Sequence, residues 1–116
     1  MEEILNRVTI ITRREKKEPL RKALCDIGVK GLTVSDVEGC GVQKGEMRYY
    51  RGSQLEVRLL PKIKFELLIP EVQMEGVLKE AQSVLFTGEV GDGKIFVEEE
   101  KRVIRIRTQE EGLEAV

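Results

Sequence analysis

The order in which strand-like and helix-like hydrophobic patterns alternate constrains the fold of this chain more than any other feature. Residues 8–12 form a β-branched run that predicts a strand. A charged stretch over 13–18 follows it. Apolar residues then recur at helical spacing over 20–27. Pro19 suits the first turn of that helix, and Gly28 is well placed to end it.

The second half of the chain repeats this alternation. Residues 55–69 predict either one bent strand or two short strands, with Pro61 at a bulge or at a sheet edge. Residues 98–101 are expected to turn. The other expected elements are strands over 32–37, 94–97 and 102–107 and a second amphipathic helix over 74–85.

The order strand, helix, strand, strand, helix, strand predicts an α+β fold, a ferredoxin-like β-α-β-β-α-β sandwich. Its two β-α-β halves follow in series, and both helices cover one face of an antiparallel sheet. The chain of 116 residues is expected to form one domain over 1–116. The second face of the sheet needs a cover, and self-association is the obvious candidate in so short a chain.

A long connection over about 39–55 interrupts the alternation. The segment GCGVQKGEMRYYRGS at 39–53 has four glycines, mixed charge and no apolar period. A loop of this length is uncommon in a compact domain, and it usually means function or disorder. The residues alone fit two readings equally: a flexible insert with Tyr49 and Tyr50 on the surface, or a loop that docks a partner.

Charge and composition exclude several classes of function. Lys and Arg number 20 and Asp and Glu number 21, a net charge of −1, so no basic excess favours nucleic acid. The chain has no His, which removes the commonest general base and the commonest metal ligand. No carboxylate dyad or activated nucleophile is evident either, so binding without fast turnover is the natural inference.

The cysteines and the apolar runs indicate the compartment. Cys25 and Cys40 are far apart, which argues against a zinc site and against a disulfide framework. We interpret both as reduced thiols in a cytoplasmic protein, with Cys25 packed in a helix interface. The acidic N-terminus does not resemble a signal peptide, and no apolar run approaches the roughly 20 residues of a membrane span.

The sharpest local motif is a glycine-rich loop over about 87–94, which contains GEVGDGK with the spacing G-x-x-x-x-G-K. Glycines let backbone amides approach phosphates, and a lysine neutralises their charge. Ile95 stands where a P-loop needs Ser or Thr to hold magnesium, and the loop connects a helix to a strand, the reverse of the P-loop order. A hydrolytic P-loop is therefore disfavoured, and spacing alone fits a phosphate loop and a plain glycine turn equally.

Arg105 and Arg107 form a second candidate feature. Residues two apart on a strand share one face, and two guanidinium groups on one face suit a polyphosphate, since arginine binds phosphate through paired hydrogen bonds. Taken alone, a solvated edge strand whose arginines pair with the acidic run at 98–100 is the better reading. Combined with the glycine loop and the long connection, the pair favours a nucleotide sensor whose loop reports occupancy.

The sequence resembles the PII (nitrogen-regulatory) signal proteins over nearly its whole length. The combination T-G-x-x-G-D-G-K-I-F with R-I-R-T is the most specific part of the resemblance. The matching segments are GVKGLTV at 28–34, GVQKG at 41–45, YRG at 50–52, LPK at 60–62, TGEVGDGKIFV at 87–97 and VIRIRT at 103–108.

The resemblance implies a homotrimer in which ATP and ADP compete for clefts between subunits. It implies that Gln43 helps to hold Mg²⁺ together with 2-oxoglutarate and that Lys62 pairs with a carboxylate of that ligand. Two residues of the nucleotide site, Arg105 and Arg107, would reach the phosphates from the neighbouring subunit. The residues that match the family's nucleotide site are Thr33, Gly41, Gly91, Asp92, Gly93, Lys94, Arg105 and Arg107.

The long connection matches the family's T-loop, which docks onto a target such as an ammonium transporter or an enzyme of nitrogen metabolism. Tyr49, Tyr50 and Arg51 are the expected docking residues, and Arg51 matches the arginine that plugs the transporter pore. Ser53 matches a serine that is phosphorylated in cyanobacterial members. Leu55 stands where many bacterial members carry a uridylylated tyrosine, so we expect no modification there.

Two departures from the family pattern leave an alternative open. Val42 replaces an arginine beside the phosphates, and Glu89 replaces a usual lysine in the glycine loop. Both remove positive charge, which would weaken ATP binding, shift the preference towards ADP, or suit a different effector. The alternative is a diverged adenine-nucleotide sensor that does not respond to 2-oxoglutarate and controls a different transporter or enzyme.

Two other classes of function are weaker. A small ATPase or phosphotransferase lacks the P-loop hydroxyl and any histidine, so we expect no enzyme activity. An RNA-binding module is suggested only by the strand at 94–97, because such modules need exposed aromatic residues and this chain has three Phe and two Tyr. We expect no nucleic-acid partner and no direct insertion into a membrane.

Overall fold

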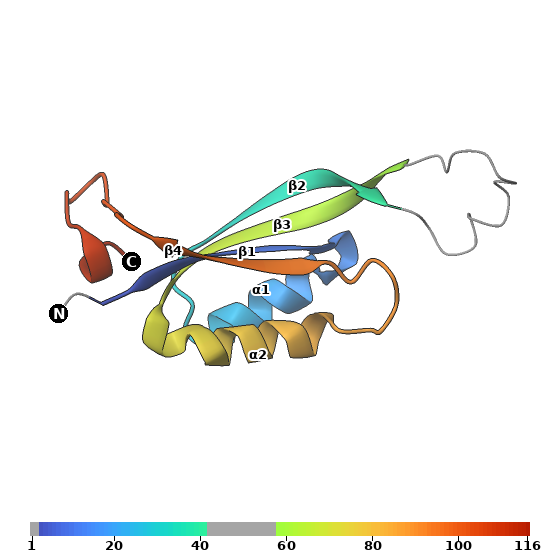
Figure 1. The fold of residues 1–116 in the computed structure, drawn as a ribbon, viewed down its shortest axis with the longest axis horizontal. Helices are drawn as coiled ribbons and strands as arrows, with labels where there is room; N and C mark the ends of the chain where they lie inside the picture. Colours follow the sequence, from blue (N-terminus) through green and yellow to red (C-terminus); the bar gives the residue numbers. More distant parts are fainter. Residues whose placement is uncertain (1–2, 42–57) are drawn as a thin grey trace, which may run out of the picture.

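The computed structural model describes residues 3–41 and 58–116 (Figure 1). Short 3-10 turns precede both helices, at Arg14–Lys16 and Glu71–Gln73, and a third lies near the C-terminus at Gly112–Ala115. Residues named above that lie outside the described part are Val42, Gln43, Tyr49, Tyr50, Arg51, Ser53 and Leu55. The main elements are β1 (Leu5–Arg13), α1 (Lys17–Asp26), β2 (Leu32–Gly41), β3 (Arg58–Pro70), α2 (Met74–Leu85) and β4 (Lys94–Glu100).

The four strands form one antiparallel sheet in the order β2-β3-β1-β4. Figure 1 shows both helices on the same face of this sheet. The described elements therefore follow the β-α-β-β-α-β order of the ferredoxin-like sandwich, and the long connection joins β2 to β3. This arrangement confirms the predicted α+β fold class.

The hydrophobic core lies between the sheet and the two helices. Alternate residues of β1, Val8 and Ile10, point into it and are fully buried, as expected for a strand with one face covered. They meet Phe65 from β3 and Leu20 and Leu24 from α1, which are also fully buried. The core thus fixes β1 in the middle of the sheet, with β4 on one side and β3 on the other.

The opposite face of the sheet carries charge towards the end where β1 begins and β4 ends. Arg7 on β1 forms ion pairs with Glu66 on β3 at 3.2 Å and with Glu100 on β4 at 2.7 Å. All three belong to alternate positions that point away from the helices. A copy that covered this face would therefore meet a polar network as well as apolar side chains.

Both helices lie close to where the sequence predicted them. The predicted helix over 74–85 coincides with α2, and α1 begins at Lys17, so that Pro19 occupies its first turn. Gly28 ends α1 with a φ of +91° while its amide donates to the carbonyl of Cys25. The packing predicted for Cys25 is wrong: its side chain is exposed, because Leu20 and Leu24 define the buried side of the helix and Cys25 turns away from it.

The segment around Pro61 is a single strand. Pro61 pairs with Glu38 of β2 but lies beyond the end of β1, where Arg13 faces Lys62. Among the described strands it therefore has a neighbour on one side only. An edge position tolerates a residue without an N–H group. On the partner strand, β2 extends to Gly41, past the start at 39 that was predicted for the long connection.

The strand predicted over 102–107 is wrong, and so is the turn over 98–101. β4 continues to Glu100, and the chain then folds back through a single bridge between Ile104 and Glu111. Gln109, at φ +62°, donates its amide to the carbonyl of Arg105. An alternating sequence forms a strand only beside a partner strand, and within the described part of the chain none lies next to these residues. Ile106 is consequently 92% exposed.

Candidate functional site

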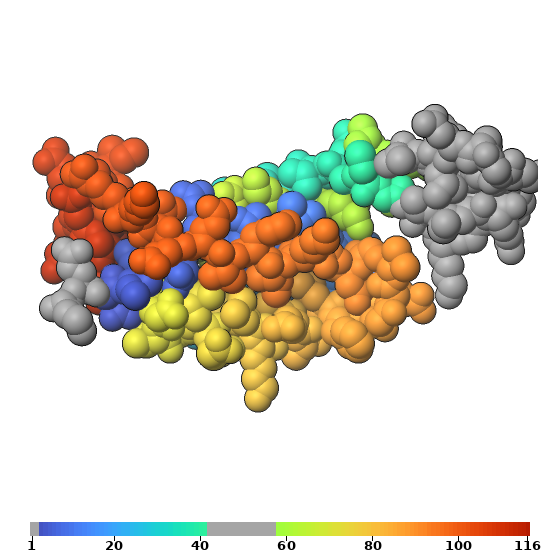
Figure 2. Space-filling model, viewed as in Figure 1, coloured from blue at the N-terminus to red at the C-terminus, as the bar shows by residue number. Residues whose placement is uncertain are grey.

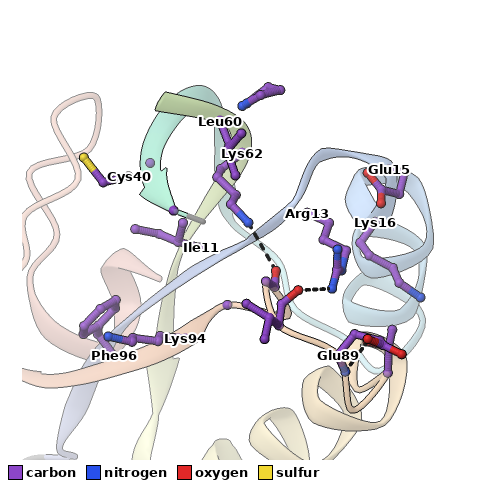
Figure 3. A pocket seen from close by; sticks show the side chains of 17 residues that line it. Ile11, Arg13, Glu15, Lys16, Cys40, Leu60, Lys62, Glu89, Lys94 and Phe96 are labelled. Atoms are coloured by element: carbon purple, nitrogen blue, oxygen red, sulfur yellow. Dashed lines mark hydrogen bonds between the residues drawn. The ribbon is translucent and has the colours of Figure 1, made fainter. Parts of the chain in front are cut away.

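A cavity of about 930 Å³ opens beside the end of the sheet from which the long connection leaves. Figure 3 shows the side chains around it. Four segments line it: the end of β1 with the following turn, the last residues of β2, the 60–62 part of β3, and the glycine loop with the start of β4. The antiparallel sheet brings these distant parts of the sequence together, since β1 pairs with both β3 and β4.

The glycine loop takes a backbone path that favours glycine at three positions, the first of which is Gly88 with a φ of +84°. Gly91 and Gly93 have φ values of +103° and +102°, which L side chains rarely adopt. At Gly93 a Cβ atom would come within 1.9 Å of the carbonyl oxygen of Ile11 on β1. The loop therefore lies directly against the backbone of β1, and only glycine fits there.

Side chains from β1 and β3 hold three successive carbonyl groups of this loop. The bonds run from Arg13 Nη2 to Val90 O at 2.7 Å, from Lys62 Nζ to Gly91 O at 3.2 Å and from Thr12 Oγ1 to Asp92 O at 2.8 Å. Two of the three donors are cations, and Thr12 is fully buried. Figure 3 shows the Arg13 and Lys62 side chains reaching the loop from separate strands.

The backbone amides in the second half of the loop differ from these carbonyls. No hydrogen bond from the amides of Gly91, Asp92 or Gly93 is found within residues 3–41 and 58–116. Consecutive free amides in a glycine-rich turn form an anion-binding concavity. Lys94 follows directly and lines the same cavity, so the arrangement suits an anion with several oxygens, such as a phosphate chain.

Asp92, by contrast, is engaged inside the loop. Its carboxylate accepts hydrogen bonds from the amides of Thr87 at 2.8 Å and Gly88 at 3.0 Å and from the Thr87 hydroxyl. Arg13 adds an ion pair at 3.4 Å. The Thr87 hydroxyl and the Thr87 amide are the leading causes that lower the pKa of Asp92 to about 2.

Of the nine predicted site residues in the described part of the chain, the structure brings five to the cavity. Asp92 is engaged inside the glycine loop and lines a different pocket, and the other three lie elsewhere. Thr33 is the second residue of β2 and lines a second cavity, of about 570 Å³, together with Val116. Arg105 donates to the carbonyl of Val116 at 2.9 Å, and Arg107 is exposed in the turn that follows. The five at the first cavity are Gly41, Lys62, Gly91, Gly93 and Lys94.

The arginines and the glycine loop sit at opposite ends of β4 (Figure 1). β4 has seven residues, which span about 20 Å at the usual rise of a strand. A phosphate chain in the cavity is therefore out of reach of Arg105 and Arg107 of the same chain.

Sequence reasoning missed Thr12, Arg13 and Lys16. They were grouped with the β-branched run and the charged stretch that follows it, with no role assigned. Arg13 and Lys16 line the cavity, and Arg13 Nε is buried without a hydrogen-bond partner in the described part of the chain. The signal available in the sequence was the pair of cations Arg13 and Lys16, at the end of the first strand and in the turn that follows it, beside the glycine loop.

Comparison with known proteins identifies this arrangement. Residues 5–110 match the family model described as nitrogen regulatory protein P-II. The chain belongs to the PII family. It is 48% identical over 103 residues to the nitrogen regulatory protein GlnK of Escherichia coli K12, covering 89% of this chain and 92% of the relative. It is 44% identical over 110 residues to the nitrogen regulatory PII-like protein of Bacillus subtilis, covering 95% of both chains.

Solved structures agree with this assignment. The fold is similar to that of B. subtilis GlnK in an ATP complex, with a TM-score of 0.82, 43% identity, and coverage of 97% of this chain and 98% of the other. Arabidopsis thaliana PII bound to citrate gives a TM-score of 0.77 at 34% identity, with 97% and 92% covered. PII proteins are signal transducers without enzymatic activity, so this chain is a nitrogen regulatory signal protein and not an enzyme.

No helix in the described part of this PII protein is long and apolar enough to cross a membrane. Figure 2 shows the face of the molecule on which β4, the glycine loop and α2 meet.

Proposed function

We propose that the cavity beside the glycine loop binds the phosphates of ATP and ADP. The protein would then signal to its target whether a nucleotide occupies this cavity. The observation that carries this proposal is the loop backbone itself. Side chains of β1 and β3 bind three of its carbonyls, the amides at 91–93 have no acceptor within the described residues, and Lys94 lines the cavity. The 43% identical B. subtilis relative with an ATP complex supports it.

The nucleotide cleft is proposed to form between subunits of a homotrimer. Each chain carries the glycine loop at one end of β4 and the two arginines at the other. In a cyclic assembly the interface is head-to-tail, so one end of a subunit meets the other end of its neighbour. Arg105 and Arg107 of the neighbour would then supply the charge that Val42 does not provide. Gly41 lines the same cavity, whereas the two other predicted nucleotide-site residues, Thr33 and Asp92, do not.

The effector is proposed to be 2-oxoglutarate, bound together with Mg-ATP. Lys62 and Arg13 face the cavity from two strands, and a dicarboxylate suits two partly buried cations. The citrate-bound Arabidopsis relative supports a polycarboxylate ligand. Within the described residues no cluster of three or more metal-ligating side chains exists, so Mg²⁺ would rely on phosphate oxygens and on Gln43. Glu89, which lines the cavity, keeps open the alternative of a nucleotide sensor without a 2-oxoglutarate response.

The output is proposed to pass through the long connection of this single 1–116 domain to a target such as an ammonium transporter or an enzyme of nitrogen metabolism. Tyr49, Tyr50 and Arg51 are the proposed docking residues and Ser53 a proposed modification site. We also propose that the protein acts in the cytoplasm, with its two exposed free cysteines reduced.

Calorimetric titration with ATP and with ADP, each repeated with Mg²⁺ and 2-oxoglutarate, tests these proposals. We expect saturable binding near one nucleotide per subunit, and 2-oxoglutarate binding only with Mg-ATP. The Lys94→Gln variant should lose most of the affinity, whereas Lys79→Gln, on the exposed side of α2, should bind as the parent does. Nucleotide binding with no effect of 2-oxoglutarate would select the alternative sensor, and no nucleotide binding at all would end the proposal.

A subunit-mixing experiment tests the shared cleft. Lys94→Gln and Arg105→Gln subunits should each bind nucleotide poorly as pure proteins. If the cleft takes the loop from one chain and the arginine from the next, co-expression of the two restores intact clefts at about a quarter of the positions in a randomly mixed ring. Recovery of binding in the mixture supports the shared cleft, and a mixture as inactive as its components contradicts it.

A further inference from the structure

The glycine loop is closed by a small hydrogen-bonded ring that the nucleotide proposal does not use. The Asp92 carboxylate spans back over five residues to accept from the amides of Thr87 and Gly88 and from the Thr87 hydroxyl. The Thr87 hydroxyl in turn accepts from the amide of Glu89 at 3.1 Å. We call these bonds between Thr87 and Asp92 the clasp. It joins the end of α2 to the start of β4.

The clasp and the carbonyl contacts act on the same stretch of backbone. The carbonyl of Asp92 itself accepts from Thr12, while Arg13 binds both the Asp92 carboxylate and the carbonyl of Val90. The carboxylate uses the amides at the start of the loop, at residues 87 and 88. The amides at 91–93 have no acceptor among residues 3–41 and 58–116. The clasp therefore decides which amides of the loop remain available to a ligand.

From these contacts we infer that Thr87 and Asp92 are positioning residues, which shape the loop for an anion, and that the Asp92 carboxylate does not contact the nucleotide. The inference rests on the proposed nucleotide site. A free carboxylate among phosphates would repel them. Here three N–H and O–H donors and the Arg13 guanidinium surround the charge, so it is turned inward and balanced where it stands.

Three possible roles of the Asp92 carboxylate predict different results for the same variant, Asp92→Asn. If the carboxylate merely repelled phosphates, Asp92→Asn would bind nucleotide more tightly. If it were a ligand through Mg²⁺, the loss would appear only when Mg²⁺ is present. If it forms the clasp, Asp92→Asn loses acceptors for amide donors and the loop opens, so binding weakens with or without Mg²⁺.

The experiment compares Asp92→Asn, Thr87→Val, Thr87→Ser and the Asp92→Asn/Thr87→Val double variant by calorimetry with ATP and ADP, in Mg²⁺ and in EDTA. Loss of one or two net hydrogen bonds corresponds to about a 3- to 30-fold weaker affinity, equal for ATP and ADP. Thr87→Ser keeps the hydroxyl and should bind within about twofold of the parent. The double variant should be no weaker than the weaker single variant, because the two residues act as one unit.

Asp26→Asn serves as the charge-matched control, since Asp26 is exposed on α1 and pairs only with Lys22 among the described residues. Urea unfolding of every variant separates a local effect from loss of the fold. Tighter or unchanged binding by Asp92→Asn, a loss confined to Mg²⁺, or additive effects of the two substitutions would each overturn the clasp while leaving the nucleotide site intact. A parent protein that binds no nucleotide would instead overturn the proposed function on which the clasp rests.

Discussion

Replacing Gly93 with alanine tests how the glycine loop is attached to the sheet. The added Cβ would lie 1.9 Å from the carbonyl oxygen of Ile11 and 2.9 Å from Thr12 Cα. These are backbone atoms of β1, so no side-chain rotation relieves the contact. Ile11 pairs with Lys64 on one side and with Lys94 on the other, which holds this carbonyl in the middle of the sheet.

Two costs add in this variant. A non-glycine residue at a φ of +102° costs about 1–3 kcal/mol, and forcing extra volume against a packed backbone costs about 1–3 kcal/mol more. The sum, about 2–6 kcal/mol, is a large part of the roughly 5–15 kcal/mol that stabilises an ordinary domain. With a urea m-value of about 2 kcal/mol per molar, the midpoint of unfolding should fall by about 1–3 M.

The assay is equilibrium urea unfolding of Gly93→Ala beside Gly76→Ala, both in nucleotide-free protein. Gly76 lies inside α2, and a Cβ there meets nothing within 4 Å. Alanine favours a helix over glycine by about 1 kcal/mol, so this control should raise the midpoint. The same substitution is thus expected to act with opposite signs at two positions. A Gly93→Ala midpoint equal to that of the parent would refute the close approach of the loop to β1.

Three further outcomes follow from the structure. Cys40 lines the cavity and Cys25 lies on the outer side of α1, so ATP should slow alkylation of Cys40 while leaving that of Cys25 unchanged, as mass spectrometry would show. Asp92 has a pKa lowered to about 2, below its value of about 3.9 in an unfolded chain. Its stabilising contribution is therefore complete above about pH 4 and is lost as the pH falls towards 2, and acid titration of Asp92→Asn should lack that loss. Phe65 is fully buried, and Phe65→Ala should cost about 3–5 kcal/mol in urea unfolding; a cost below 1 kcal/mol would contradict the core described above.

Those parts of the fold that follow from local pattern were predictable. The helix over 74–85 was placed at its observed bounds because its apolar side repeats over three turns, and the end of α1 because Gly28 alone there can take a positive φ. The strand over 102–107 failed for the opposite reason. Its alternation is genuine, but whether such a segment forms a strand depends on a neighbour that its own sequence does not specify.

The candidate site also has one part that the local sequence predicts and another part that it does not. The glycine loop is contiguous in sequence, so its motif could be recognised. The donors that shape it are not: Thr12 and Arg13 reach residues 77 to 80 positions away. Those contacts depend on the register in which Ile11 faces Lys94, and register follows from the whole sheet. The engagement of Asp92 by its own loop was equally hidden, because a family pattern records which residue is present and not where its carboxylate points.

Beyond the end of β1, the strands β2 and β3 continue alone as a two-stranded ribbon, with Gly41 facing Arg58 at its tip (Figure 1). A ribbon without lateral neighbours twists and bends more readily than a four-stranded body. The ribbon joins the four-stranded part of the sheet at Lys62, the first residue of β3 that pairs with β1 and one of three that bind carbonyls of the glycine loop. Because Lys62 lines the cavity, a rotation of the two strands there would displace the tip of the ribbon, where the long connection begins, further than it displaces Lys62 itself.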